Sequence, residues 1–260
     1  MNFRTVQYAE SANITTITLN RPDKRNAISY ELIDDLIAAL HQAANASPSI
    51  VILTGAGSAF CAGMDLDNLK QLIGRSDEQN LRDSQTMAGL FRALYDFPKV
   101  TIAAVNGAAI AGGTALATLC DFTLAVPEAK FGYTEVRIGF VPGIVSSYLI
   151  ASVGEKVARD LLLTGRLFDA EEAHQMGLVR EVVAADQLMS RARELAQELM
   201  EVSPASLKVT KALLSSYTKD LLDRQLARAI KENASIRQTA DFKEGVSSFL
   251  ERRKPKWKSS

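Results

Sequence analysis

The sequence predicts an α/β fold followed by an all-helical C-terminal region. Short apolar runs alternate with segments of helical spacing over about two-thirds of the chain, whereas the last part shows only helical patterns. No low-complexity linker interrupts the 260 residues, a length that suits one large domain with a smaller appendage. We therefore expect a core domain over residues 1–200 and a helical region over residues 201–260.

The elements of the first half are predicted from alternation, helical spacing and capping residues. Alternating or continuous apolar runs predict strands at residues 3–8, 14–19, 50–53 and 100–105. Ser29 is placed to cap a helix whose apolar positions fall on one face, and Asp65 to cap a helix that begins near Leu66. The charged stretch 74–85 is expected to be mobile, or helical with little burial, before a helix around residues 87–95.

In the second half, strands are expected at residues 122–126 and 178–183. Ser203-Pro204 is a helix-start signal, because serine caps well and proline is tolerated at the first helical position. Three helices are then expected, one through Tyr217, one near residues 220–237 and one near residues 241–253.

A junction of small residues follows the strand at residues 100–105. Asn106-Gly107 predicts a turn, and Ala111, Gly112 and Gly113 then open a helical segment. Small residues allow another molecule to approach the main chain, and the first N–H groups of a helix have no partner inside it. Such N–H groups can stabilise a negative charge, including an oxyanion that forms during a reaction.

Composition excludes several classes of function. The 30 basic and 30 acidic residues give a net charge of zero, which argues against a nucleic-acid or anionic-membrane partner. Cys61 and Cys120 lie far apart in apolar surroundings, and we interpret them as free thiols in a reducing compartment. Only two histidines are present, so we expect no metal site. The chain has no secretion signal and no membrane-spanning stretch, so a soluble, cytoplasmic protein is expected.

Most catalytic motifs are also missing. The Gly55-Ala56-Gly57 stretch lacks the third glycine of a dinucleotide fingerprint, because Phe60 occupies its position. Neither a nucleophile elbow nor a phosphate-binding P-loop occurs, and both histidines fall in ordinary helical segments. Backbone donors and a carboxylate remain as the chemistry available.

Five blocks, in this order and spacing, resemble the enoyl-CoA hydratase/isomerase (crotonase) family. They are Arg21-Pro22 with Asn26-Ala27, the stretch 60–66 (FCAGMDL), Asn106-Gly107 through Gly112-Gly113 to Cys120-Asp121, the stretch 131–135 (FGYTE), and Pro142-Gly143. The resemblance covers essentially the whole chain. It implies a spiral of ββα units, a C-terminal trimerisation region and a homotrimer or dimer of trimers. It also implies a coenzyme A thioester as substrate, with no separate cofactor.

The resemblance assigns catalytic roles to three residues. The backbone N–H groups of Met64 and Gly112 would form the oxyanion hole, and Glu135 would be the acid–base residue. A carboxyl group enclosed by apolar walls has a raised pKa, which suits proton transfer in both directions near neutral pH.

The resemblance also implies substrate-binding positions. The loop with Ala62, Gly63, Asp65 and Leu66 would border the acyl group. Arg25, Ala27 and Arg252 would lie along the coenzyme.

One position departs from the family pattern and leaves the reaction open. Ala115 stands where a typical family hydratase has its first glutamate. The block 134–139 resembles the single-glutamate hydratases that act on branched substrates such as methylglutaconyl-CoA, so we favour hydration of a 2-enoyl thioester. The alternatives are a 3-enoyl to 2-enoyl isomerase, which needs one base only, and a non-catalytic module that binds acyl-CoA or a protein.

Overall fold

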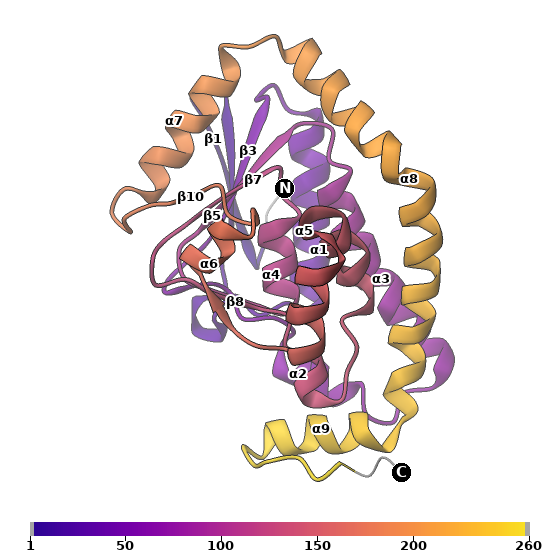
Figure 1. Ribbon diagram of the computed structural model, residues 1–260. Coiled ribbons are helices and arrows are strands. Elements are labelled where there is room, and N and C mark those ends of the chain that lie inside the picture. Colours follow the sequence, from indigo (N-terminus) through magenta and orange to yellow (C-terminus); the bar gives the residue numbers. More distant parts are fainter. Residues whose placement is uncertain (1–2, 258–260) are drawn as a thin grey trace.

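Two sheets form the centre of the molecule in the computed structural model, which describes residues 3–257 (Figure 1). The larger sheet has the strand order β1-β2-β3-β5-β7-β10, and only its β1–β2 pair is antiparallel. Its strands are β1 (Val6–Ser11), β2 (Ile14–Leu19), β3 (Ile50–Gly55), β5 (Val100–Val105), β7 (Phe122–Ala125) and β10 (Glu181–Val182). The smaller sheet consists of β4 (Ala59–Cys61), β6 (Ala108–Ile110), β8 (Lys130–Gly132) and β9 (Phe168–Asp169), in that order.

Successive strand pairs divide between the two sheets. In β3–β4, β5–β6 and β7–β8 the first strand joins the larger sheet and the second joins the smaller one, and a helix follows each pair. The helices are α1 (Tyr30–Asn45), α2 (Leu66–Gln71), α3 (Asp77–Tyr95), α4 (Gly112–Thr118), α5 (Gly143–Thr164), α6 (Ala170–Gln175), α7 (Leu188–Met200), α8 (Pro204–Ser235) and α9 (Ala240–Leu250). Short 3-10 helices are η1 (Pro22–Lys24), η2 (Glu135–Ile138) and η3 (Ile236–Gln238). The expected α/β architecture of ββα units is confirmed.

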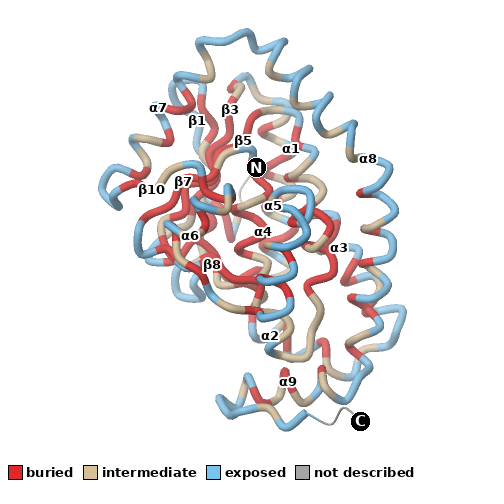
Figure 2. The backbone as a smooth tube through the Cα atoms, viewed as in Figure 1, coloured by how far each residue is buried: buried red, intermediate tan, exposed pale blue. Residues whose placement is uncertain are grey.

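The core lies around the central parallel strands, which are buried in Figure 2. Every residue of β5 and all but the last residue of β3 are buried. Both strands are continuous apolar or small-residue runs, as expected when helices cover both faces of a parallel sheet.

Three predicted helix starts are confirmed by side-chain caps. The hydroxyl of Ser29 accepts from the backbone N–H of Leu32 at 3.2 Å, and the carboxylate of Asp65 accepts from that of Asp67 at 2.9 Å. Ser203 caps α8 in the same way, with Pro204 at its first position. Each cap satisfies a backbone donor that the first helical turn leaves free.

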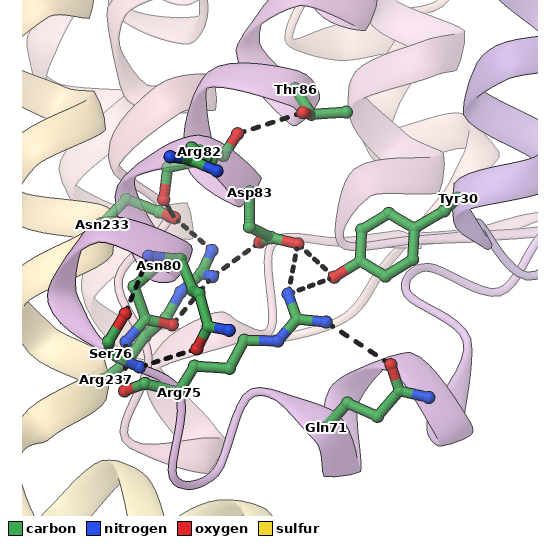
Figure 3. Close-up of polar contacts among 12 residues, drawn as sticks. Tyr30, Gln71, Arg75, Ser76, Asn80, Arg82, Asp83, Thr86, Asn233 and Arg237 are labelled. Atoms are coloured by element: carbon green, nitrogen blue, oxygen red, sulfur yellow. Dashed lines mark hydrogen bonds and ion pairs between the residues drawn. The ribbon is translucent and has the colours of Figure 1, made fainter.

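Residues 74–85 are largely helical and mostly exposed, as expected, but the expectation of little burial fails at three positions. This stretch contains the first half of α3, and its residues Asn80, Asp83 and Ser84 are buried. Figure 3 shows the reason: Arg237 of η3 reaches Asp83, with 2.6 Å between Nη1 and Oδ2. A partner more than 150 residues away along the chain gives no local sequence signal.

The C-terminal helices also differ from the prediction. Helix α8 runs for 32 residues without a break, where two helices were expected. No glycine or proline interrupts residues 205–244, so nothing in the sequence ends the helix there. Helix α8 packs against α3 and α5 and leads down one side of the molecule to α9 (Figure 1). Residues 258–260 of the predicted C-terminal region and residues 1–2 of the core lie outside the described residues.

The remaining differences concern short strands. The predicted strand at residues 178–183 is reduced to β10, and the four short strands of the smaller sheet, β4, β6, β8 and β9, were not predicted. Cys61 and Cys120 are buried free thiols, as predicted. Among residues 3–257, no helix combines the length and apolar character needed to cross a bilayer.

Candidate active site

Three parallel strands of the smaller sheet bring the predicted catalytic residues to one edge. Strand β6 pairs in parallel with both β4 and β8. Met64 follows β4, Gly112 follows β6 and Glu135 follows β8, each within three residues of the strand end. Because the carboxyl ends of parallel neighbours meet at the same edge of a sheet, the three residues lie close together.

The backbone N–H of Met64 donates to no acceptor within residues 3–257, although its neighbours are bonded on both sides. The N–H of Ile28 donates to the oxygen of Gly63 at 2.7 Å, and the N–H of Asp65 donates to the oxygen of Ile28 at 2.9 Å. These two bonds make an isolated parallel bridge between Ile28 and Met64. Because the bonds are made by Gly63 and Asp65, on either side of Met64, the N–H of Met64 itself points away from the segment of Ile28. This donor is therefore available to a ligand.

The backbone N–H of Gly112, the first residue of α4, likewise has no acceptor in the described part of the chain. Ala111 precedes it with φ 51° and ψ −118°, a conformation that only glycine adopts without strain. Gly113 lies against β4, since a Cβ there would be 2.1 Å from the oxygen of Cys61. The start of α4 is therefore held at a close approach that a side chain at position 113 would prevent.

The two donor segments also contact each other directly. Gly63, which precedes Met64, has φ 87°, and a Cβ there would lie 2.9 Å from the oxygen of Ile110 and 3.3 Å from the Cβ of Ala111. Gly63 and Ala111, the residues before the two donors, thus both have a positive φ, and their two turns pack against each other. This contact fixes the spacing of the two N–H groups.

Glu135 begins η2, and its carboxyl group is withdrawn from water. Oε2 is buried and has no hydrogen-bond partner among the described residues, while the residue as a whole is half-buried. Burial raises the pKa of Glu135 from its ordinary value of 4.5 to about 7. A carboxyl group with this pKa can both accept and donate a proton near neutral pH.

Hydroxyl groups surround Ala115, the position that departs from the family pattern. A cavity of about 10 Å³, close to the smallest that can hold one water molecule, is lined by Ala115, Thr118, Tyr133 and Tyr148 among others. The Tyr133 and Thr118 hydroxyls are 3.0 Å apart, and the Tyr148 hydroxyl is buried with no partner among residues 3–257. Burial raises the pKa of both tyrosines, so they stay neutral. The lining identified around Ala115 contains no carboxylate that replaces the first glutamate.

The side chain of Asp65 is buried and forms an ion pair with Arg21. Its Oδ2 lies 2.9 Å from Nη2 of Arg21, and the exposed fractions of the two side chains are 5% and 19%. The two residues are 44 positions apart in the sequence, which explains why no sequence pattern predicted this pair. Asp65 therefore shapes the Met64 loop through buried contacts.

The other predicted binding residues are distributed around this loop. Arg25 is exposed with φ 49°, and its oxygen accepts from the N–H of Ala62 at 3.0 Å. Ala27 is buried, Leu66 is exposed, and Arg252 is exposed just after the end of α9. Arg25, Ala27, Ala62 and Leu66 lie on the segments that frame Met64.

No group of three histidine, cysteine or carboxylate side chains within residues 3–257 is arranged to hold a metal ion. The site consists of two backbone donors and one carboxyl group, which is the arrangement expected for stabilising an enolate and moving a proton beside it.

Comparisons with known proteins show the family of this chain. The family described as Enoyl-CoA hydratase/isomerase matches residues 9–260. This chain belongs to the enoyl-CoA hydratase/isomerase family. It is 42% identical over 250 residues to a Thermus thermophilus protein whose name describes it as an enoyl-CoA hydratase. The match covers 95% of this chain and 98% of that protein.

Other members of the enoyl-CoA hydratase/isomerase family are similar over nearly the whole chain. The 2,3-dehydroadipyl-CoA hydratase of Escherichia coli K12 is 35% identical, with 94% of this chain and 95% of that protein covered. The crystal structure of an enoyl-CoA hydratase/isomerase from Xanthobacter autotrophicus Py2 superposes with a TM-score of 0.89 at 29% identity, covering 96% of this chain and 94% of the other. The family acts on acyl-CoA thioesters, which matches the predicted class of substrate.

Proposed function

We propose that this chain adds water to a 2-enoyl-CoA thioester, with Met64 and Gly112 as the oxyanion hole and Glu135 as the single acid–base residue. The observation that carries the proposal is the convergence of two backbone N–H groups, which have no acceptor among residues 3–257, and one buried carboxyl group at the ends of three neighbouring strands. The reaction needs no cofactor beyond the coenzyme A of the substrate.

The proposed mechanism uses Glu135 twice. As a carboxylate it removes a proton from water while the water oxygen bonds to C3 of the substrate, and the electron pair of the C2–C3 double bond moves to the thioester oxygen. The two N–H groups stabilise that enolate, and one such donor contributes about 2.7–4 kcal/mol in other enzymes. When the enolate collapses, Glu135 returns the proton to C2, which restores the carboxylate and releases the 3-hydroxy thioester.

Ala115 favours a second candidate, isomerisation of a 3-enoyl to a 2-enoyl thioester. That reaction moves one proton between C2 and C4 and needs a single base, so the missing first glutamate is no obstacle. The same two N–H groups would stabilise the dienolate. Both reactions use the same atoms of the protein, and their products distinguish them.

For coenzyme binding, we propose that Arg25 and Arg252 contact the phosphates and that Ala27 lies along the coenzyme, since both arginines are exposed. The segment Ala62–Leu66 would border the acyl group. Two buried free thiols are consistent with the reducing cytoplasm, where we place the enzyme.

We further propose that α8 mediates assembly into a homotrimer or a dimer of trimers. Large apolar side chains on the first two-thirds of this helix are exposed in the single chain: Val209, Leu213, Leu214, Tyr217 and Leu221. An exposed apolar face of this size indicates a protein interface. Tyr217→Glu is expected to yield monomers by light scattering, whereas Lys231→Glu, an exposed control on the same helix, leaves the assembly intact. A Tyr217→Glu variant that keeps the assembly would contradict this role for α8.

The deciding experiment offers the purified protein crotonyl-CoA and a 3-enoyl-CoA in deuterated water. Hydration produces a 3-hydroxy thioester with deuterium at C2, and isomerisation moves the double bond and places label at C2 or C4. Conversion of the 3-enoyl substrate alone would establish the isomerase. Binding of both thioesters with conversion of neither would refute both reactions and favour a non-catalytic module.

A further inference from the structure

Arg21 connects the two segments that form the bridge around Met64. Its Nη1 donates to the oxygen of Ala27 at 2.5 Å, and its Nη2 contacts Oδ2 of Asp65 at 2.9 Å. Ala27 precedes Ile28 and Asp65 follows Met64, so one guanidinium group spans the bridge from its first segment to its second.

The direction of the Met64 donor depends on this bridge. The oxygen of Gly63 and the N–H of Met64 belong to one planar trans peptide unit and point in opposite directions. Because the N–H of Ile28 holds the oxygen of Gly63 at 2.7 Å, the N–H of Met64 must point away from Ile28. Any rotation of this peptide breaks that bond and turns the donor out of position.

Arg21 is itself fixed to the protein core. Its backbone N–H donates to Oδ1 of Asn26 at 2.8 Å. Asn26 is fully buried, with φ 54°, and its Nδ2 donates to the oxygen of Ala59 in β4 at 2.8 Å. The strand that leads to Met64 and the arginine that clamps the Met64 loop thus share one hydrogen-bonded support.

We propose that Arg21 is a positioning residue for the oxyanion hole. Its guanidinium group contacts Asp65 and Ala27, and these contacts hold the Met64 peptide in the orientation that points its N–H at the thioester oxygen. This inference rests on the proposed function, because it assigns Arg21 a role through the Met64 donor. The planar guanidinium group of arginine makes two contacts in a fixed geometry, whereas the donors of a lysine ammonium group rotate and radiate from one atom.

The test measures how strongly the protein polarises a bound carbonyl group. The probe is butyryl-CoA labelled with carbon-13 at C1, a saturated thioester that cannot be hydrated, and the readout is its C=O stretching band in infrared difference spectra. Steady-state kinetics with crotonyl-CoA and thermal unfolding complete the set. The variants are Arg21→Met and Arg21→Lys. The control is Arg191→Met, which removes an arginine of α7 that is similarly exposed and pairs with Glu181 of β10.

In the wild type, binding should shift the C=O band to lower frequency. Arg21→Met should lose much of this shift and about 10- to 100-fold in kcat, less than the complete loss of a donor costs, with KM changed by less than about threefold. Arg21→Lys should show a smaller loss in the same direction, and Arg191→Met should match the wild type.

Separate outcomes overturn the inference and the proposed function. A folded Arg21→Met variant with the wild-type band overturns the inference even if kcat falls, since the loss would then be structural. If Arg21→Met does not fold, Arg21→Lys decides, and a wild-type band in that variant overturns the inference. A wild-type protein that binds butyryl-CoA without any band shift refutes the oxyanion hole itself, and with it the proposed function.

Discussion

Replacing Glu135 by glutamine tests the acid–base assignment through both stability and rate. Glutamine keeps the shape of the side chain but cannot ionise. In the unfolded chain the carboxyl group of Glu135 loses its proton near pH 4.5, whereas burial holds the proton until about pH 7 in the folded protein. The unfolded state therefore gains stability from deprotonation as the pH rises between these values.

The magnitude follows from the two pKa values. The interval between 4.5 and about 7 corresponds to about 3 kcal/mol of unfolding free energy, an order-of-magnitude figure. Below pH 4.5 the difference in unfolding free energy between the wild type and Glu135→Gln should not change with pH. Above about pH 7 the unfolding free energy of the wild type should be lower, relative to the variant, by these roughly 3 kcal/mol. Urea unfolding of both proteins at equal concentration, between about pH 5 and pH 8, measures the difference while other titrating groups cancel.

Activity should respond to the same ionisation. The carboxylate is the active form for hydration, so kcat/KM of the wild type should rise with pH through about 7 and then level off. Glu135→Gln should lose about 10²- to 10⁴-fold in kcat, the usual contribution of a general acid–base residue, while thioester affinity stays nearly unchanged. A pH-independent difference in stability, together with an active glutamine variant, would refute the reasoning.

Two further predictions concern packing. Gly113→Ala should lower both the melting temperature and kcat, because its Cβ would be 2.1 Å from a backbone oxygen. The control Gly89→Ala, where nothing lies within 4 Å of the new Cβ, should be neutral or stabilising by up to about 1 kcal/mol. Wild-type kinetics for Gly113→Ala would show that this contact is unimportant. Arg237→Met should destabilise the protein by about 3 kcal/mol in urea unfolding, because it leaves the buried carboxylate of Asp83 without its closest cation. The exposed Arg228→Met serves as control, and equal unfolding free energies for the two variants would contradict this reasoning.

Local patterns were sufficient to predict most elements of the fold. Caps such as Ser29 and apolar runs such as residues 100–105 act within a few positions of the chain, so the sequence displays them directly. The free N–H groups at the start of α4 could be predicted for the same reason, since the small residues around Gly112 follow a recognisable strand. The family resemblance then supplied the roles of Met64 and Glu135.

Features that depend on distant partners could not be predicted in this way. The stretch 74–85 looks solvated, yet Asp83 is buried because it pairs with Arg237 and with Tyr30 (Figure 3). Burial, followed by the hydrogen bond to Asp83, raises the pKa of Tyr30 to about 12. The Arg21–Asp65 pair behind the Met64 loop is hidden for the same reason. Long-range ion pairs join residue types that are ordinarily exposed, so composition and periodicity classify them as surface.

The position of Glu135 links the candidate site to the C-terminal helices. Its helix η2 is held between the smaller sheet and α9: a Cβ on Gly245 would lie 2.2 Å from the oxygen of Ile138, and one on Gly139 would lie 2.4 Å from the oxygen of Asp241. Such contacts require the two backbones to pack without side chains between them. Since α9 follows α8 through η3, where Arg237 is anchored to α3, a displacement of the C-terminal helices would move η2 as well. The helical region expected to serve assembly therefore packs directly against the 3-10 helix that begins at Glu135, whose carboxyl group has its pKa raised to about 7 by burial.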